Sequence, residues 1–325
     1  MGLELINAQG QAFGTVAEAL LACNMQTSGL RTNSVLRYKE WEVIDKALVE
    51  EVQSVLRAVA DVKSRNLTHN VGAGLAAMVL MYEKIGKMGR AKVSMDGEEQ
   101  GRRDRVTYEP GYLPLPIIFQ DFSINARVLA ASRLNGSNLD DTQTRMAGRS
   151  VAEELEELLV NGDGSFAYGG GQIYGYTSAP GRNLGDFTDW LASGADPVTD
   201  VLAMKQASIA AGFRGPWIHY VPPTYETILD EDYSSVKGEK TVRQRITAID
   251  RVAACESLDC LADGQMLLVQ MTPDVVRMVS ALPLQNVEWK EGAGTRTNFK
   301  ALTIDVPQVR CTKAGKSGVT HFTKT

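Results

Sequence analysis

The sequence predicts an α+β fold, in which helices and antiparallel strands occupy different stretches of the chain. Two segments, 41–62 and 139–160, carry apolar residues at helical spacing, whereas residues 287–322 run as short alternating or apolar strands. The order of these segments is not the strand–helix–strand alternation of a nucleotide-binding fold. With 325 residues, of which 44% are hydrophobic and 22% charged, the composition is that of a folded protein long enough for two modest domains.

The N-terminal part of the chain predicts an extended arm followed by a helix. Residues 1–38 mix small, polar and scattered apolar residues and lack the apolar density of a core element, so we expect an arm that becomes ordered against another surface. Residues 41–62 have the apolar stripe of an amphipathic helix, formed by Trp41, Ile44, Leu48, Val52, Val55 and Val59.

A long hairpin is predicted between residues 71 and 118. Two extended apolar runs, 71–85 and 106–118, flank a polar tip that is rich in glycine and in charges of both signs. The basic residues of this stretch are Lys84, Lys87, Arg90, Lys92, Arg102, Arg103 and Arg105. A run of charged residues is most often a solvated loop. A hairpin of this length is unusual in a compact domain, however, and its length indicates a functional role.

The second helix, 139–160, carries its charges against its own dipole. Arg145 and Arg149 lie in its N-terminal half, and the C-terminal half contains Glu153, Glu154, Glu156 and Glu157. Cations near the positive end of a helix and anions near its negative end are both unfavourable. The pattern favours partners outside the helix, with a solvated acidic face as the alternative.

The rest of the chain predicts a second α+β region and a set of closing strands. Residues 196–211 and 225–232 are predicted helices, and residues 217–221, 252–256 and 266–271 are predicted buried strands. Residues 272–281 predict a short helix with Pro273 in its first turn. Antiparallel strands are then expected at 287–290, 299–309 and 318–322.

The sequence predicts no catalytic, cofactor-binding or metal site. His69, His219 and His321 lack metal-ligand spacing, and Cys255 and Cys260 are too far apart for a CxxC motif. The glycines at 169–171 lack the Lys-Ser/Thr ending of a phosphate loop.

A net charge of -5 argues against bulk electrostatic binding of nucleic acid, although not against a protein that surrounds it. We see no leader or membrane-spanning segment and expect synthesis in a reducing cytoplasm.

Residues 113–183 carry a resemblance to a known family. The run LPIIFQDFSI (115–124), the turn NGSNLDD (135–141), a long helix closing on NG (161–162) and the stretch GGQIYGYTSAP (170–180) follow one another in that order. In this order and spacing they resemble the major capsid proteins of tailed bacteriophages and the related encapsulins.

The resemblance implies a phage major capsid fold and assigns its parts. These are an N-terminal arm (1–38), a P-domain helix region (39–70), a long E-loop hairpin (71–116), a P-domain with spine helix 139–160 and antiparallel sheet (117–185), an A-domain (186–271), and a return to the P-domain with closing strands (272–325). Some members crosslink an E-loop lysine to a neighbour. Lys87 and Lys92 match by position only, and we expect no crosslink here.

The implied function is structural and not enzymatic. We expect a subunit that self-assembles as pentamers and hexamers into the icosahedral head shell of a virion, enclosing double-stranded DNA without sequence-specific binding. Portal, scaffolding and decoration proteins are the expected partners, and no membrane is involved. An encapsulin compartment that loads a cargo enzyme is the alternative, and a soluble enzyme with an unrecognised site is a third. The expected contacts between copies involve Lys87, Arg90, Lys92, Arg102, Arg103, Arg105, Arg145, Arg149, Glu153, Glu154, Glu156 and Glu157.

Overall fold

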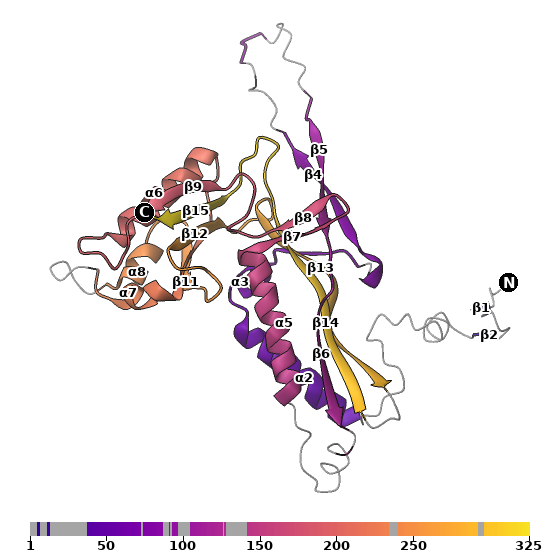
Figure 1. Ribbon diagram of the computed structural model, residues 1–325. Helices are drawn as coiled ribbons and strands as arrows, with labels where there is room; N and C mark the ends of the chain where they lie inside the picture. Colours follow the sequence, from indigo (N-terminus) through magenta and orange to yellow (C-terminus); the bar gives the residue numbers. More distant parts are fainter. Residues whose placement is uncertain are drawn as a thin grey trace.

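A computed structural model shows two lobes and a projecting hairpin (Figure 1). It describes residues 38–325, apart from 73, 87–90, 92, 97–104, 126, 128–141, 234–239 and 292–295. Before residue 38 it describes only two short strands, β1 (Leu5–Ile6) and β2 (Ala12–Phe13), which pair antiparallel.

The first lobe packs two long helices beside a four-stranded sheet. Helices α2 (Tyr38–Val55) and α5 (Thr142–Val160) lie side by side, and the short helix α3 (Ala58–Ser64) follows α2 (Figure 1). Gly148 lies where α5 meets α2, and a Cβ at this position would lie 2.8 Å from a methyl carbon of Leu48. A small residue is therefore required for the two helices to approach this closely.

The sheet of this lobe has the order β3-β13-β14-β6. A long antiparallel ribbon of β13 (Val276–Glu291) and β14 (Arg296–Val309) forms its centre, with Val276 opposite Val309 at one end and Glu291 opposite Arg296 at the other. Strand β6 (Ile118–Asn125) pairs antiparallel with β14, and β3 (Thr68–Asn70) pairs parallel with β13. The core between sheet and helices includes Val59, Val151, Leu159, Val279 and Ile304, all nearly inaccessible to solvent.

The second lobe is built on a five-stranded sheet of order β11-β10-β12-β15-β9. Its strands are β9 (Asn183–Phe187), β10 (Trp217–Val221), β11 (Val252–Ser257), β12 (Gln265–Gln270) and β15 (Val319–Lys324). Its helices are α6 (Pro197–Ala211), η2 (Pro223–Tyr225), α7 (Glu226–Asp230) and α8 (Val242–Thr247). A separate core, rich in aromatic side chains, holds the helices against the sheet and includes Phe187, Trp190, Trp217 and Tyr225.

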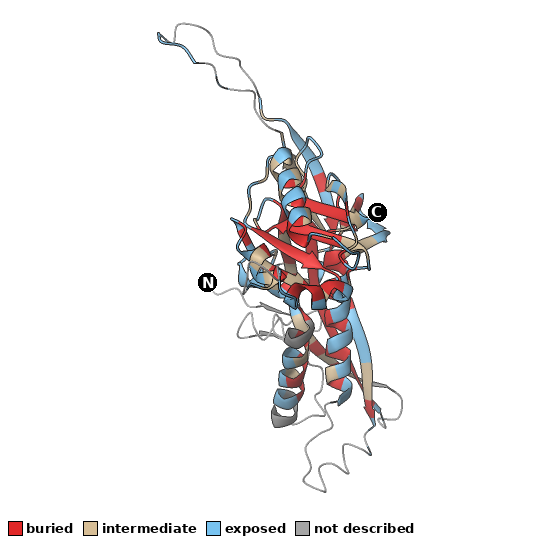
Figure 2. Cartoon of the chain, turned by 90° about the vertical axis from the view of Figure 1, so that its left-hand side faces the viewer, coloured by how far each residue is buried: buried red, intermediate tan, exposed pale blue. Residues whose placement is uncertain are grey.

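Two hairpins complete the fold. Strands β4 (Val79–Ile85) and β5 (Tyr108–Pro114) pair antiparallel along their full length and extend away from both lobes (Figure 1). The short helix η1 (Gly74–Ala76) precedes β4. Strands β7 (Gly162–Tyr168) and β8 (Gly171–Tyr174) follow α5 and pack against the root of the first hairpin through β5. The buried residues lie at the centre of the molecule, and most of the described residues of the hairpin are exposed (Figure 2).

The structure confirms the pairing of the two runs of the predicted hairpin, the helix at 196–211 and the strands near 217–221, 252–256 and 266–271. The predicted second helix is found at Thr142–Val160, and the expected residues 139–141 lie outside the described part of the chain.

Three expectations are wrong in detail. The single helix at 41–62 is broken between α2 and α3. Residues 272–281 form a turn and the start of β13 instead of a helix, because residues 276–280 pair with β14, and a short, mostly apolar run fits either structure. The last strand, β15, does not join β13 and β14 but lies between β12 and β9 in the other sheet.

We expect Gly171→Ala to lower the free energy of unfolding by about 1–3 kcal/mol, as overpacking of a tight contact does. A Cβ at residue 171 would clash with the backbone carbonyl of Tyr112, where β8 meets β5. Gly164→Ala in the same hairpin is the matched control, because a Cβ there has no atom within 4 Å. Thermal unfolding of both variants measures the difference, and equal stability of the two would contradict the close packing at Gly171.

Candidate assembly surface

The exposed side of α5 carries most of the predicted contact residues that the structure describes. Arg149, Glu153, Glu154 and Glu157 are exposed, and Arg145 is half-buried. Of the basic residues expected at the hairpin tip, Arg105 is described and exposed, whereas Lys87, Arg90, Lys92, Arg102 and Arg103 lie outside the described residues.

Several of these charges have partners within the subunit. Arg149 Nε donates to Glu153 Oε1 at 2.8 Å, one turn along the helix, and Arg145 lies 3.8 Å from Glu50 of α2. Asn161 Nδ2 donates to Glu157 Oε1 at 2.8 Å. Exposed pairs of this kind contribute little to stability, so their carboxylates and guanidinium groups remain accessible to a further partner.

Glu156 differs from its neighbours because it points into the subunit. Its carboxylate accepts hydrogen bonds from the backbone N–H groups of Arg57 (2.8 Å), Ala58 (2.6 Å) and Val59 (3.0 Å). These are the first N–H groups of α3, which have no partners within a helix. Glu156 therefore caps α3 from another helix, and its buried carboxylate is not available to a neighbouring copy, contrary to the expected contact set.

This cap also explains the break after α2. A carboxylate at the N-terminus of a helix satisfies free N–H groups and interacts favourably with the helix dipole. The carboxylate of Glu156, which opposes the dipole of α5, thus interacts favourably with that of α3. The unfavourable charge order of α5 was the signal in the sequence, but the sequence did not identify the partner helix.

The cap lies where the two lobes meet. The Arg57 side chain donates to the carbonyl and hydroxyl of Ser257 at the end of β11 (3.2 and 3.1 Å). Tyr220 of β10 donates its hydroxyl proton to Asp61 of α3 at 2.8 Å and stacks against Tyr176. Helix α3 is therefore bonded to α5 of one lobe and to two strands of the other.

Burial controls the ionisation of this cluster. Burial raises the pKa of Glu156, and the three backbone N–H groups partly offset that rise. Burial likewise raises the pKa of Asp61, offset in part by the hydrogen bond from Tyr220 and by Arg65. Tyr176 and Tyr220 are completely buried, and their pKa values lie well above the ordinary value for the same reason.

A groove of about 690 Å³ runs beside α5 at this joint. Its charged lining is mostly acidic and comprises Glu51, Glu153, Glu154, Glu156, Glu157 and Asp259, together with Arg57 and Arg149. Such a concentration of carboxylates attracts a basic segment.

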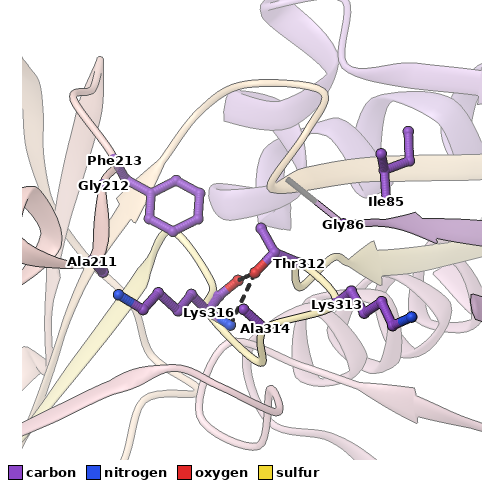
Figure 3. A pocket seen from close by; sticks show the side chains of 9 residues that line it. All are labelled: Ile85, Gly86, Ala211, Gly212, Phe213, Thr312, Lys313, Ala314 and Lys316. Atoms are coloured by element: carbon purple, nitrogen blue, oxygen red, sulfur yellow. Dashed lines mark hydrogen bonds between the residues drawn. The ribbon is translucent and has the colours of Figure 1, made fainter. Parts of the chain in front are cut away.

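A second hollow, of about 510 Å³, lies between the hairpin and the second lobe (Figure 3). Ile85 and Gly86 line it from the end of β4, Phe213 from the turn after α6, and Lys313 and Lys316 from the loop before β15. Its described lining contains no carboxylate, histidine or cysteine, and its polar side chains are those of Thr312, Lys313 and Lys316.

A buried histidine and a buried cysteine lie beside each other in the second lobe. His219 Nδ1 lies 3.4 Å from Cys255 Sγ, but burial lowers the pKa of His219 to about 3 and raises that of Cys255 to about 12. The thiol is therefore not ionised at neutral pH.

Within the described residues there is no group of three or more His, Cys, Asp or Glu residues that could hold a metal ion. None of the helices described is long and apolar enough to cross a membrane.

Residues 35–322 match the model of a family described as Family of unknown function (DUF6260). The chain belongs to this family. The type 1 encapsulin shell protein EncA of Myxococcus xanthus (strain DK1622) is similar to this chain in sequence. The two are 23% identical over 211 residues, which cover 64% of this chain and 69% of the relative.

Solved structures show which fold this member of the family adopts. A virus-like particle from Pyrococcus furiosus superposes with a TM-score of 0.64 at 15% identity, covering 88% of this chain and 98% of that one. The capsid of Myoviridae Phage XM1 superposes with a TM-score of 0.58 at 14% identity, covering 79% and 89%. The expected phage capsid fold, which encapsulins share, is thereby confirmed.

We expect Glu156→Ala to lower the free energy of unfolding of the unassembled subunit by about 2–3 kcal/mol, because the first N–H groups of α3 lose their acceptor. Glu154→Ala, which removes an exposed carboxylate from the same helix, is the matched control and should change stability by less than about 0.5 kcal/mol. Urea unfolding measures both. Equal effects would show that the cap does not stabilise α3.

Proposed function

We propose that this protein is a structural subunit that assembles with copies of itself into a closed shell. The observation that carries the proposal is the extent of the structural likeness: the superposition covers 88% of this chain and 98% of the chain of a virus-like particle. The exposed charges of α5 and the projecting hairpin suit contacts between copies, because head-to-tail contacts between different surfaces close into rings and shells.

We further propose that the shell is a phage head. In this reading the subunits form pentamers and hexamers of an icosahedral virion capsid that encloses double-stranded DNA, with portal, scaffolding and decoration proteins as partners. The likeness to a solved phage capsid supports it. The second candidate is an encapsulin compartment with a cargo enzyme, which the likeness to EncA favours. Both are structural roles, and we assign no catalytic residue.

The proposed contact places the basic hairpin of one copy against the acidic groove beside α5 of another. The hairpin residues are Lys87, Arg90, Lys92, Arg102, Arg103 and Arg105. The α5 residues of the proposed contact are Arg149, Glu153, Glu154 and Glu157, which line the groove, and Arg145, which lies one turn before it; Glu156 is left out because it is buried. Each exposed ion pair is weak, but many pairs in one shell act together.

The purified protein is expected to elute as particles in the megadalton range and to show uniform shells in negative-stain micrographs. A small monodisperse oligomer would contradict the proposal and favour the third possibility, a soluble enzyme. Nuclease-protected double-stranded DNA inside shells isolated from the natural source would support the phage head. A co-purifying enzyme without DNA would support the compartment.

Reversing two charges at the hairpin, Arg102→Glu with Arg103→Glu, is expected to lower the yield of shells about tenfold at roughly 150 mM salt, because like charges then face the groove. Adding Glu154→Arg and Glu157→Arg to the same chain should restore the yield. Electron micrographs and sedimentation measure it. Normal assembly of the first variant, or no recovery in the second, would refute the charge contact.

A further inference from the structure

The hollow between the hairpin and the second lobe combines apolar walls with two lysines (Figure 3). Its volume of about 510 Å³ is that of a small-molecule site. Ile85 supplies an apolar wall from the end of β4, and Phe213 supplies another from the turn after α6. Lys316 extends toward the end of α6, whereas Lys313 extends toward the hairpin, where a Cβ on Gly86 would lie 3.6 Å from its Cδ (Figure 3). The hollow thus has an ammonium group at each of two sides and an apolar surface between them.

Neither lysine has a counter-ion among the described residues, where no carboxylate forms an ion pair with Lys313 or Lys316. Other described lysines do have carboxylate partners: Lys63 with Asp305, Lys84 with Glu109, Lys300 with Asp121 and Lys324 with Asp189. The chain has 39 acidic and 34 basic residues, so carboxylates are in excess overall. Their absence from the described lining of this hollow is therefore local.

Two arginines extend the positive charge beside the hollow. Arg310 lies at the end of β14 and donates to the backbone carbonyl of Glu83 on β4 at 3.4 Å. Burial and the nearby Arg310 both lower the pKa of Arg277, whereas a carboxylate within reach would raise it. The side chains of Glu83 and Asp274 form no ion pair with either arginine in the described part of the chain. The local field consequently favours an anion.

The loop that carries the two lysines is held in place by its own hydrogen bonds. Thr312 N donates to the carbonyl of Lys316 at 2.8 Å, and Lys316 N donates to Thr312 Oγ1 at 3.2 Å. Gly315, with a φ of +69°, closes this turn, and Ser317 N donates to the carbonyl of Gly181 at 2.9 Å. Because the backbone is fixed, little ordering of the loop is required when a ligand binds.

We propose that this hollow binds a small amphipathic anion, with its apolar body against Ile85 and Phe213 and its carboxylate or phosphate group held by Lys313 and Lys316. Lysine binds such oxygens as a point charge, and the ring of a half-buried phenylalanine offers a face to an alkyl or aromatic body. An apolar compound without charge would leave both lysines unpaired, and an inorganic anion would leave the apolar walls exposed. The inference does not rest on the proposed shell, because binding is measured on the purified chain in any state of assembly.

The test is a fluorescence titration with anilinonaphthalene sulfonate, an aromatic anion whose emission rises in apolar surroundings, in a buffer free of phosphate. We expect binding in the micromolar range and displacement by dodecanoate or by adenosine monophosphate. Dodecanoate as the stronger competitor assigns an alkyl body, and adenosine monophosphate assigns an aromatic one. Displacement by neither overturns the proposal. Equal displacement by inorganic phosphate also overturns it, since charge alone would then decide binding.

Lys313→Gln with Lys316→Gln should weaken binding of the stronger competitor by about tenfold, because both charged contacts are lost. These lysines are exposed in a surface turn, so the fold should be kept, as thermal unfolding can verify. The matched control is Lys46→Gln with Lys240→Gln, which removes two exposed lysines outside the hollow. Undiminished binding in the first variant, or an equal loss in the control, overturns the assignment to this hollow.

A second variant, Ala314→Asp, adds a carboxylate to the lining beside the two lysines and should also weaken binding about tenfold, because it competes for their charge. Ala192→Asp, at an exposed position of the second lobe outside the hollow, is its control and should leave binding unchanged. Equal affinities of these two variants contradict the proposal. A failure of the chain to form particles bears only on the proposed function.

Discussion

The arrangement of the subunit depends on one buried carboxylate, that of Glu156. Through three short hydrogen bonds to the start of α3, it fixes the direction of α3 relative to α5. Because α3 in turn accepts a hydrogen bond from Tyr220 at Asp61, and Arg57 reaches Ser257, the orientation of the second lobe follows from the same contact. A rigid joint matters to a subunit whose surfaces must meet copies of themselves at fixed angles.

Much of the fold could be predicted because it follows from local patterns. The apolar spacing in 41–62 and 142–160 identifies helices with one buried face, and these faces do pack together, with Gly148 at their contact. The hairpin was predictable for the same reason, since two apolar runs around a polar tip have few other ways to satisfy their backbone groups.

The predictions that were wrong concern segments whose structure is set by contacts with residues distant in the sequence and not by the pattern of neighbouring residues. Nothing near residue 57 in the sequence ends a helix; the acceptor that allows a new N-terminus lies 99 residues away. Residues 276–281 form a strand because Val276 and Met278 pair with Val309 and Pro307, and the apolar run alone does not distinguish this from a helix. The inward direction of Glu156 among three outward glutamates is equally a property of packing and not of composition.

The position of β15 has a consequence for the order of events during synthesis. Residues 319–324 lie between β12 and β9 and so join the edge strand β9 to the rest of the five-stranded sheet. Until residues 319–324 have left the ribosome, β9 has no partner strand and β12 has an open edge. The second lobe closes only when this last strand emerges, so a nascent chain cannot present the finished shape of a subunit.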